Sequence, residues 1–443
     1  MTDERTSRDP RRTFMFWLAP TLAVAVLAVF LAGAYLGGNV NPRANLHGFP
    51  VAIVNADRGA GTIDGGELKA GDQVVDGLVE GIDAGQFDLR HLTGDEAIEQ
   101  MARGELYGSI VIPENFSARL NAWGIGTLVG NDVVAPEIRI VSNPSAGLGA
   151  STIVKEMGFE VGDQVDVAVG KQLLERVQSA AADADAQPTG TALAAAAHPV
   201  DVKFEDFHPL PDGTGNGLSA FYWTLLIVLA GFTGAMVTGQ IVDNRLGIHS
   251  LEWGPIFVRH PHHGVSRLGT LVAKFGMSAT QGALVAALYV LIGTIVGMPL
   301  ASPFALWGFT ATMIVAVGWV SHAINALLGN PGLIVNLIAF IVLGLPSAGG
   351  TLPLEAVPEF FRWLGLISPM HQIYLGSRSM LYLDRTWDSG VGQALIYAGA
   401  SVAIAVAVGA IAAVWFDRKG WRRAGLADPG KRPEPAVLSG GMA

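Results

Sequence analysis

The chain has 443 residues, of which half are hydrophobic and only 15% are charged. A soluble globular chain carries about a quarter charged residues, so this composition indicates a membrane protein. The chain contains no cysteine, which excludes disulfides, zinc–thiolate sites, iron–sulfur clusters and cysteine nucleophiles. An extracytoplasmic domain in this chain would therefore depend on its own hydrophobic core for stability.

Charge is distributed unevenly along the chain. Residues 38–216 contain 26 acidic and 11 basic side chains, a net charge of −15, whereas the remaining residues have a net charge of +5. An acidic middle with basic flanks is expected when these segments lie on opposite sides of a membrane. The acidic segment carries no basic stripe, so we expect no nucleic-acid partner.

The first apolar stretch, Phe14–Leu36, runs for 23 residues without a charge. As a helix it would be about 35 Å long, enough to cross a hydrocarbon core of roughly 30 Å. The alternative is a cleaved signal peptide, because Ala32–Ala34 offers small residues. A usual signal core has only about 7–15 apolar residues. We therefore interpret residues 1–37 as a cytoplasmic N-terminus followed by an uncleaved first transmembrane helix.

Residues 38–216 are interpreted as an extracytoplasmic α/β domain. Apolar or alternating runs bounded by turn-forming residues predict strands at three places, 51–54, 109–112 and 137–141. Thr93 and Glu96 have the spacing of a capping box, which predicts a short helix ending near Met101. The alanine-rich stretch 146–197 has acidic residues at helical intervals and predicts a long helical arm.

Five more apolar stretches follow and predict a five-helix membrane domain over residues 217–416. They cover residues 218–242, 268–298, 304–328, 332–350 and 391–416. With the N-terminus inside, the basic loop 243–267 and the tail 417–443 fall on the cytoplasmic side, as the positive-inside rule requires. Among the basic segments, Arg378 and Arg385 before the last span are the exceptions. The sequence therefore predicts an α-helical polytopic protein of the inner (plasma) membrane, with six transmembrane helices and both termini cytoplasmic.

The segment 346–388 does not fit a full membrane span. Proline and glycine interrupt its apolar residues at six positions: Pro346, Gly349, Gly350, Pro353, Pro358 and Pro369. Broken backbone near a membrane is tolerated only where protein or a water-filled cavity covers it. We interpret the segment as a re-entrant pair of short helices on the outer side.

This re-entrant segment is also a candidate gate for a substrate pathway. Gly349 and Gly350 would permit a turn at its tip. Three aromatic side chains would seal a cavity below it: Phe360, Phe361 and Trp363. The alternative is a plain amphipathic helix lying on the outer membrane face, with Glu359 and Arg362 directed towards water.

Two sets of stretches resemble a known family. Ser347–Pro353, Val357–Phe361 and Ile367–His371, together with Arg378, resemble the outer re-entrant segment that precedes the last span of ABC-2-type permeases. Val51–Ala60 and Tyr107–Ser117 resemble the extracellular domain of the YhgE/Pip branch of that family. The order of one span, a large outer domain and five spans is similar to this branch along nearly the whole chain.

The resemblance implies a permease that exports a hydrophobic or lipid-like compound, as a homodimer and with a separate ATPase subunit. The loop 243–267 would correspond to the coupling-helix region that meets the ATPase. It offers Asp243, Asn244 and Arg245 in place of the usual acidic-arginine pattern. Members of the branch are also linked with secretion machinery and phage adsorption, so a non-transporting envelope scaffold or receptor is the alternative.

Several kinds of chemistry are missing from the sequence. No phosphate-binding loop occurs, since Gly170–Gln172 lacks the upstream glycine and the following Ser or Thr. The apolar stretches contain no Asp or Glu in their interiors, although proton-coupled pumps use such carboxylates as relays. We find no catalytic triad or pair of catalytic acids. We therefore expect no enzymatic activity, cofactor or metal, and an energy source on another chain.

Polar residues in the apolar stretches allow two interpretations. His322, Asn325 and Asn336 could line a polar path or hydrogen-bond neighbouring helices together. Lys274, near the inner end of the third span, is expected to extend its ammonium to the interface. Small residues recur every four positions in the last span, at Ser401, Ala405, Gly409 and Ala413. Such a stripe fits packing within one subunit as well as dimerisation.

Overall fold

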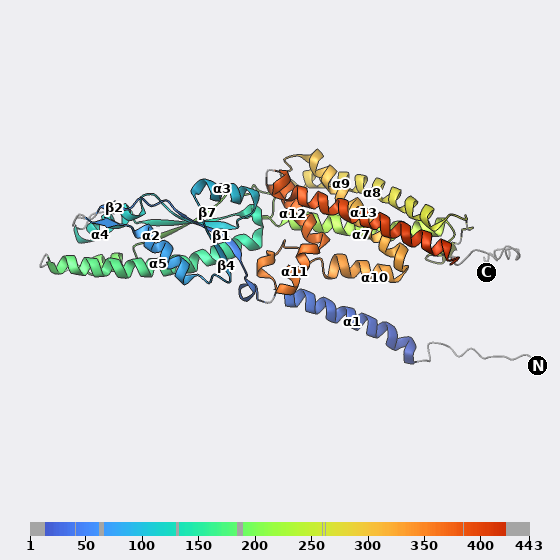
Figure 1. Ribbon diagram of the computed structural model, residues 1–443, viewed down its shortest axis with the longest axis horizontal. Helices are drawn as coiled ribbons and strands as arrows, with labels where there is room; N and C mark the ends of the chain where they lie inside the picture. The colour runs from blue at the N-terminus through green and yellow to red at the C-terminus, as the bar shows by residue number, and fades with distance from the viewer. Residues whose placement is uncertain are drawn as a thin grey trace, which may run out of the picture. The chain divides into compact units, whose positions relative to one another are not determined.

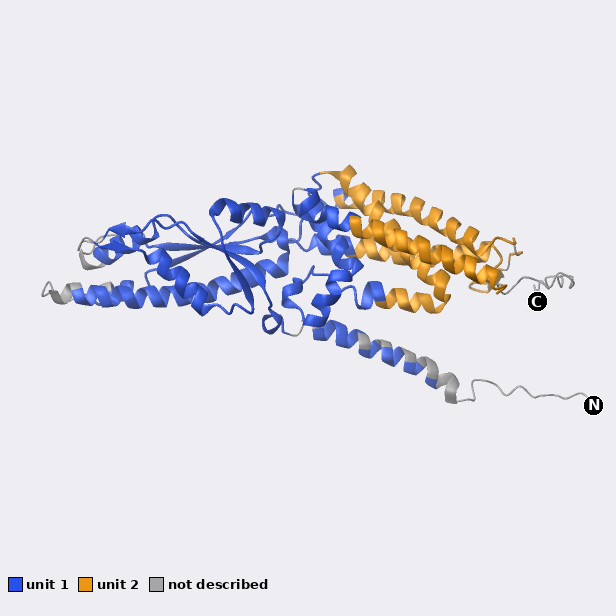
Figure 2. Cartoon of the chain, in the orientation of Figure 1, with its two compact units in different colours: residues 1–224, 294–301, 339–395 blue, residues 225–293, 302–338, 396–443 orange. Residues whose placement is uncertain are grey.

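The structure is a computed structural model that describes residues 14–39, 41–61, 66–129, 133–183, 189–258, 260–261, 263–383 and 385–421. It divides into two compact units, coloured separately in Figure 2. Unit 1 comprises residues 1–224, 294–301 and 339–395, and unit 2 comprises residues 225–293, 302–338 and 396–443. The predicted cytoplasmic residues 1–13 and the basic tail from 422 onward lie outside the described residues.

A five-stranded mixed sheet forms the centre of the α/β domain in unit 1 (Figure 1). Its strands are β1 (Phe49–Asn55), β4 (Phe87–His91), β5 (Gly108–Ile112), β6 (Glu137–Ser142) and β7 (Asp201–Asp206), in the order β4-β1-β5-β6-β7. β1 pairs in parallel with both neighbours, β5 pairs antiparallel with β6, and β6 pairs in parallel with β7. The three strands predicted from the sequence are confirmed as β1, β5 and β6.

Helices cover both faces of this sheet. Phe49, Val51 and Ile53 of β1 point to a core shared with α2 (Ala70–Gly81), α4 (Phe116–Val129) and α5 (Leu148–Asp183). The alternate residues Ala52 and Val54 pack with Ala97 and Met101 of α3 (Gly94–Arg103) on the other face. Figure 1 shows α5 and α3 on opposite sides of the strands. Both faces of β1 are therefore buried, as its uninterrupted apolar sequence indicates.

Two local predictions in this domain are confirmed. The Thr93 hydroxyl accepts a hydrogen bond from the Glu96 amide, and the Glu96 carboxylate accepts from the Thr93 amide, so the capping box begins α3. The helical arm is α5, with 36 residues. The remaining short elements are η2 (Arg43–Asn45), β2 (Ala60–Gly61), β3 (Glu67–Leu68), η3 (Pro144–Ala146) and α6 (Gly190–Ala197).

Asp57 joins the beginnings of two helices. Its Oδ1 accepts a hydrogen bond from the Ser117 amide at 2.9 Å, and its Oδ2 accepts from the Gly71 amide at 3.0 Å. The Ser117 hydroxyl donates to Asp57 Oδ2 and accepts from the Ala70 amide at 2.8 Å. First-turn amides have no partner within their own helix. Asp57 and Ser117 therefore provide hydrogen-bond acceptors for the first-turn amides of α2 and α4. Each of the two stretches that resemble the YhgE/Pip branch contributes one of these residues, so both have a structural role.

Four helices in the described residues are long and apolar enough to cross a membrane. They are α7 (Ser219–Arg245), α8 (Arg267–Ile295), α9 (Pro303–Leu328) and the helix Trp387–Arg418, which consists of a π-helical turn, Trp387–Val391, and α13 (Gly392–Arg418). They coincide with four of the predicted spans. α1 (Phe14–Asn39) covers the first predicted span with 26 residues.

The predicted span 332–350 is not one continuous helix. α10 (Pro331–Leu337) and a π-helical turn, Ile338–Val342, together make 12 helical residues, only about 18 Å of helix. The helical residues end two positions before Gly344, where a Cβ would lie 2.2 Å from the Phe340 carbonyl oxygen. Hydropathy registers the apolar character of this stretch but not the turn, so the prediction of a full-length fifth helix is wrong.

Two short helices form within the segment 346–388, as predicted. They are α11 (Glu359–Ile367) and α12 (Pro369–Tyr382), preceded by the single turn η5 (Leu354–Ala356). Pro358 and Pro369 stand at the beginnings of the two helices, where proline is well tolerated because the first amides need no helical partner.

The connection between α7 and α8 differs from the coupling helix that the resemblance implies. Its described residues form a β-hairpin of β8 (Leu251–Trp253) and β9 (Ile256–Val258). Gly254 and Pro255 make the two-residue turn, and Gly254 has a φ of +58°. A positive φ at the first turn position favours glycine and a tight hairpin.

We expect Asp57→Ala to lower the stability of the α/β domain by about 2 kcal/mol, because it leaves three donors at two helix starts without their acceptor. Hydrogen exchange of the full chain should show α2 and α4 amides exchanging roughly 30-fold faster. The control is Asp76→Ala, which removes an exposed carboxylate from the same α2. Equal exchange in the two variants would contradict this role for Asp57.

Candidate functional site

Unit 2 contains a cavity of about 950 Å³, which we call the polar cavity. It lies among α7, α8 and α9 and the connections at their ends. The residues that define it here are Asp243, Arg267, Lys274, His322, Asn325 and Asn330. Its size is at the upper end of the roughly 300–1,000 Å³ typical of ligand pockets. Its lining residues are about half polar and half apolar, a mixture that suits an amphipathic ligand.

An ion pair lies in the wall of the polar cavity. Lys274 Nζ is 2.8 Å from Asp243 Oδ2, and the two side chains are only 15% and 21% exposed. The sequence predicted that Lys274 would extend to the interface, whereas the structure pairs it with the last turn of α7. Lys274 was therefore missed as a site residue. The sequence could have indicated this ion pair, since Asp243 and Lys274 stand at the predicted inner ends of adjacent spans.

The structure brings together the three polar residues predicted for the spans. His322, which is almost fully buried, lies with its Nε2 2.9 Å from the Ser278 hydroxyl oxygen. Asn336 Nδ2 donates to the Ser321 carbonyl at 3.2 Å and to Asn325 Oδ1 at 3.1 Å. His322 and Asn325 line the polar cavity, whereas Asn336 has no exposed surface and connects α10 to α9.

The predicted ATPase-coupling residues have three different environments. Asp243 forms the ion pair with Lys274 described above. Asn244 is buried, and its side-chain amide donates to the carbonyls of His249 and Val258, both at 3.1 Å. Asn244 therefore fixes the hairpin to the end of α7. Arg245 is exposed, so it is the member of this set that is accessible to another protein.

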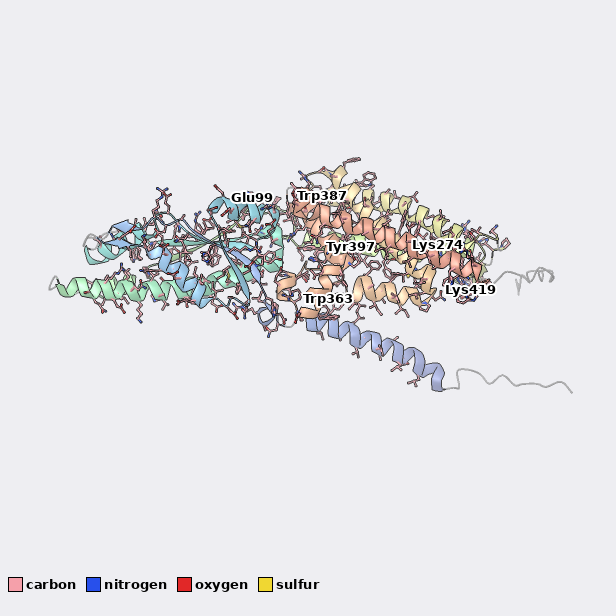
Figure 3. All side chains as sticks on the ribbon, in the orientation of Figure 1. Glu99, Lys274, Trp363, Trp387, Tyr397 and Lys419 are labelled. Carbon is pink, nitrogen blue, oxygen red and sulfur yellow. The ribbon has the colours of Figure 1, made fainter. Side chains whose placement is uncertain are left out.

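The predicted gate residues lie in unit 1 and are only partly brought together. Gly349 has a φ of +76° and packs against His371, and Gly350 packs against Phe221. Phe361 is buried, but Phe360 is 58% and Trp363 62% exposed; Trp363 is labelled on α11 in Figure 3. Phe360 and Trp363 therefore lie on the face of α11 opposite Phe361, and the three aromatic side chains do not meet at one cavity within the chain.

The small-residue stripe of the last span packs within the chain. Ala405 and Ala413 are buried. A Cβ on Gly409 would lie 2.8 Å from Leu271 Cδ2 and 3.5 Å from Ala323 Cβ. α13 therefore uses this stripe to approach α8 and α9 closely, and the stripe gives no separate support for a dimer.

Comparison with known proteins supplies a family for this chain. A family model described as "ABC-2 family transporter protein" matches residues 12–414. An "Uncharacterized protein YhgE" from Bacillus subtilis (strain 168) is 25% identical over 161 residues, which cover 36% of this chain and 19% of that protein. The match thus spans about a fifth of that relative's length. No solved structure matches the chain.

We expect Lys274→Met to destabilise the chain by about 3 kcal/mol, because it leaves the largely buried Asp243 carboxylate without its partner. The double variant Lys274→Met, Asp243→Leu removes both charges and should recover much of that loss. Thermal unfolding in detergent measures both effects. Lys419→Met, at an exposed lysine just after α13, is the control. Asp243→Leu alone completes the comparison. A loss in the double variant equal to the sum of the losses in Lys274→Met and Asp243→Leu would show that the pair does not act as one unit.

Proposed function

This chain belongs to the ABC-2 family of transporter proteins, and on that premise we propose that it is a permease that exports a hydrophobic or lipid-like compound. The observation that carries the proposal is the polar cavity. It is large, lies among helices of membrane-spanning length, and combines apolar walls with a charged pair and the His322 and Asn325 side chains. An amphipathic molecule could place its polar group on these side chains and its apolar part on the walls.

A separate ATPase subunit supplies the energy in this proposal. The sequence has no phosphate-binding loop and no carboxylate inside its apolar stretches. Asp243 does line the cavity, but its ion pair with Lys274 makes it a poor proton relay. Arg245 and the hairpin Leu251–Val258 are the proposed contact for the ATPase, with Arg245 as the exposed charge.

We propose that the chain crosses the inner (plasma) membrane six times, with both termini in the cytoplasm and the α/β domain outside. The broken stretch 331–350 would serve as the fifth crossing. Its non-helical part supports this, because Ser347 and Ala348 have no exposed surface. Irregular backbone is tolerated at membrane depth where protein covers it. The functional unit is proposed to be a homodimer, as the family resemblance implies.

The gate proposal is narrower than the sequence predicted. Gly349, Gly350 and Phe361 remain its members, because they pack inside unit 1 near the turn before α11. Phe360, Trp363 and two other apolar side chains of α11, Leu366 and Ile367, are exposed. We assign this exposed face to the lipid interface, where Trp and other amphipathic side chains are enriched.

A non-transporting scaffold or receptor is the second candidate function. The observation that favours it is the net charge of −15 on residues 38–216, which would attract a basic partner. In that case the α/β domain would act as a binding surface, and the polar cavity would contribute only to packing.

We expect a deletion strain to retain a fluorescent amphiphile that the wild-type strain exports. Plasmid-borne wild type should restore efflux, whereas Asn325→Leu, which removes a polar group from the cavity wall, should reduce it several-fold at equal expression. Asn121→Leu, on the exposed side of the α/β domain, is the control. ATP depletion should abolish efflux and a protonophore alone should not. Unchanged efflux in the deletion strain would favour the scaffold.

A further inference from the structure

A second cavity, of about 480 Å³, lies within unit 1 between the α/β domain and the helical segment that contains α12. We call it the junction cavity. The side chains that define it here are Arg90, Glu105, Tyr107, Glu355, Tyr374 and Arg378. Both sets of stretches that carry the family resemblance contribute to its wall, since Tyr107 belongs to one and Gly349, Pro353 and His371 to the other.

Arg378 is the most unusual residue of the junction cavity. Arg378 is only 7% exposed. It takes part in none of the ion pairs found within 4.0 Å among the described residues. Nη1 donates to the Ala146 carbonyl at 3.3 Å, but Nε has no hydrogen-bond partner among the described residues. A buried guanidinium without a counter-charge is costly. The geometry therefore leaves room for an anionic ligand.

Tyr374 supplies a second unpartnered donor on the same wall. It is 2% exposed, and its hydroxyl has no hydrogen-bond partner among the described residues. The Arg378 Cζ lies 6.0 Å from its ring centroid. Gly147 makes this arrangement possible, because a Cβ there would lie 2.8 Å from the Tyr374 hydroxyl oxygen. Neither Arg378 Nε nor the Tyr374 hydroxyl oxygen is reached by solvent, so an oxyanion in the cavity would accept from both once their side chains turn towards it.

The cavity also contains a carboxylate without a cation. Glu355 Oε2 accepts a hydrogen bond from the Tyr107 hydroxyl at 2.9 Å, and no described Lys, Arg or His nitrogen lies within 4.0 Å of it. Burial, followed by the nearby Glu355, raises the pKa of Tyr107 well above its usual value. Tyr107 therefore stays a neutral donor and does not balance the charge of Glu355.

The other charged residues of the wall already have partners. Arg90 Nε lies 2.8 Å from Asp88 Oδ2, and Glu105 Oε1 lies 3.1 Å from Arg103 Nε. One positive and one negative side chain, Arg378 and Glu355, are left. A purely anionic ligand would be repelled by Glu355 and a purely cationic one by Arg378, whereas a ligand carrying both charges would satisfy each.

We propose that the junction cavity binds a zwitterionic group, with its oxyanion on Arg378 and Tyr374 and its ammonium on Glu355. Two sources share this chemistry: the head group of a zwitterionic phospholipid such as phosphatidylethanolamine, and a free amino acid or small phosphoamine. A volume of about 480 Å³ accommodates either polar group. The proposal goes beyond the transport function, because binding here requires neither ATP nor transport.

The test measures binding to the purified full chain in detergent. Native mass spectrometry compares short-chain phosphatidylethanolamine with phosphatidylglycerol, and calorimetry compares free phosphoethanolamine and glycine with glycerol phosphate. We expect the zwitterionic member of a pair to bind at least tenfold more tightly. If only the lipid probes show a preference for the zwitterion, the cavity is a head-group site. If the soluble probes show this preference, it is a small-molecule site. Equal binding of all probes, or none, overturns the proposal.

Variants localise the effect to this cavity. Glu355→Gln keeps a hydrogen-bond acceptor for Tyr107 but removes the negative charge. The preference for the zwitterionic probe should therefore fall at least fivefold. The anionic probe should bind to this variant more tightly than it binds to the wild type. Tyr374→Phe should weaken zwitterionic and anionic probes alike, by roughly 10-fold, the effect of losing one hydrogen bond to a charged group. Glu359→Gln, at an exposed carboxylate on α11, is the matched control. An unchanged preference in Glu355→Gln would also overturn the proposal.

Discussion

Hydrogen bonds that join the α/β domain to α12 and to the turn before α11 are the contacts on which the arrangement of unit 1 depends. The Tyr382 hydroxyl accepts from the Ala220 amide at 3.0 Å and donates to the Thr214 carbonyl at 3.2 Å. The Glu355 backbone carbonyl accepts from the His47 amide at 2.9 Å. The His47 contact lies where the chain enters the α/β domain, and the Tyr382 contacts lie where it leaves. Both connections are therefore attached by hydrogen bonds to the segment around α11 and α12.

Close backbone approach makes this junction possible, and it explains several glycines. Gly104 ends α3 with a φ of +73°, and a Cβ there would lie 2.9 Å from Arg378 Nη2. A Cβ on Gly149 would lie 2.3 Å from the Thr351 carbonyl oxygen. Side chains at these positions would push the α/β domain away from the segment around α12. The junction cavity, of about 480 Å³, therefore lies beside places where the two parts approach closely.

The sequence predicted those parts of the structure that local patterns determine. Apolar runs located β1 and β5, the Thr93–Glu96 spacing located α3, and hydropathy located α7, α8, α9 and α13. The resemblance to ABC-2-type permeases is confirmed by the family match over residues 12–414. The edge strands β4 and β7 were missed, because their sequences are polar and partly exposed.

Contacts between distant residues could not be predicted in the same way. Tyr107 and Glu355 are 248 positions apart, and Asp243 and Lys274 stand on different helices. Their pairing depends on how the helices pack, which no spacing rule reports. The hairpin between α7 and α8 was also missed, although Gly254 and Pro255 carry a turn signal. The sequence marked Arg378 as part of the family resemblance and as an exception to the positive-inside rule, but it did not indicate that the side chain is buried.

The transport account rests on the orientation proposed for the chain in the membrane, in which the α/β domain would lie outside and the polar cavity would open towards the cytoplasm. The chain has no cysteine, so single cysteines can be introduced at exposed positions, as Glu80→Cys on α2 and Ser250→Cys before β8. A membrane-impermeant maleimide applied to intact spheroplasts should label position 80 at once and position 250 only after rupture. Labelling in the reverse order would contradict the account.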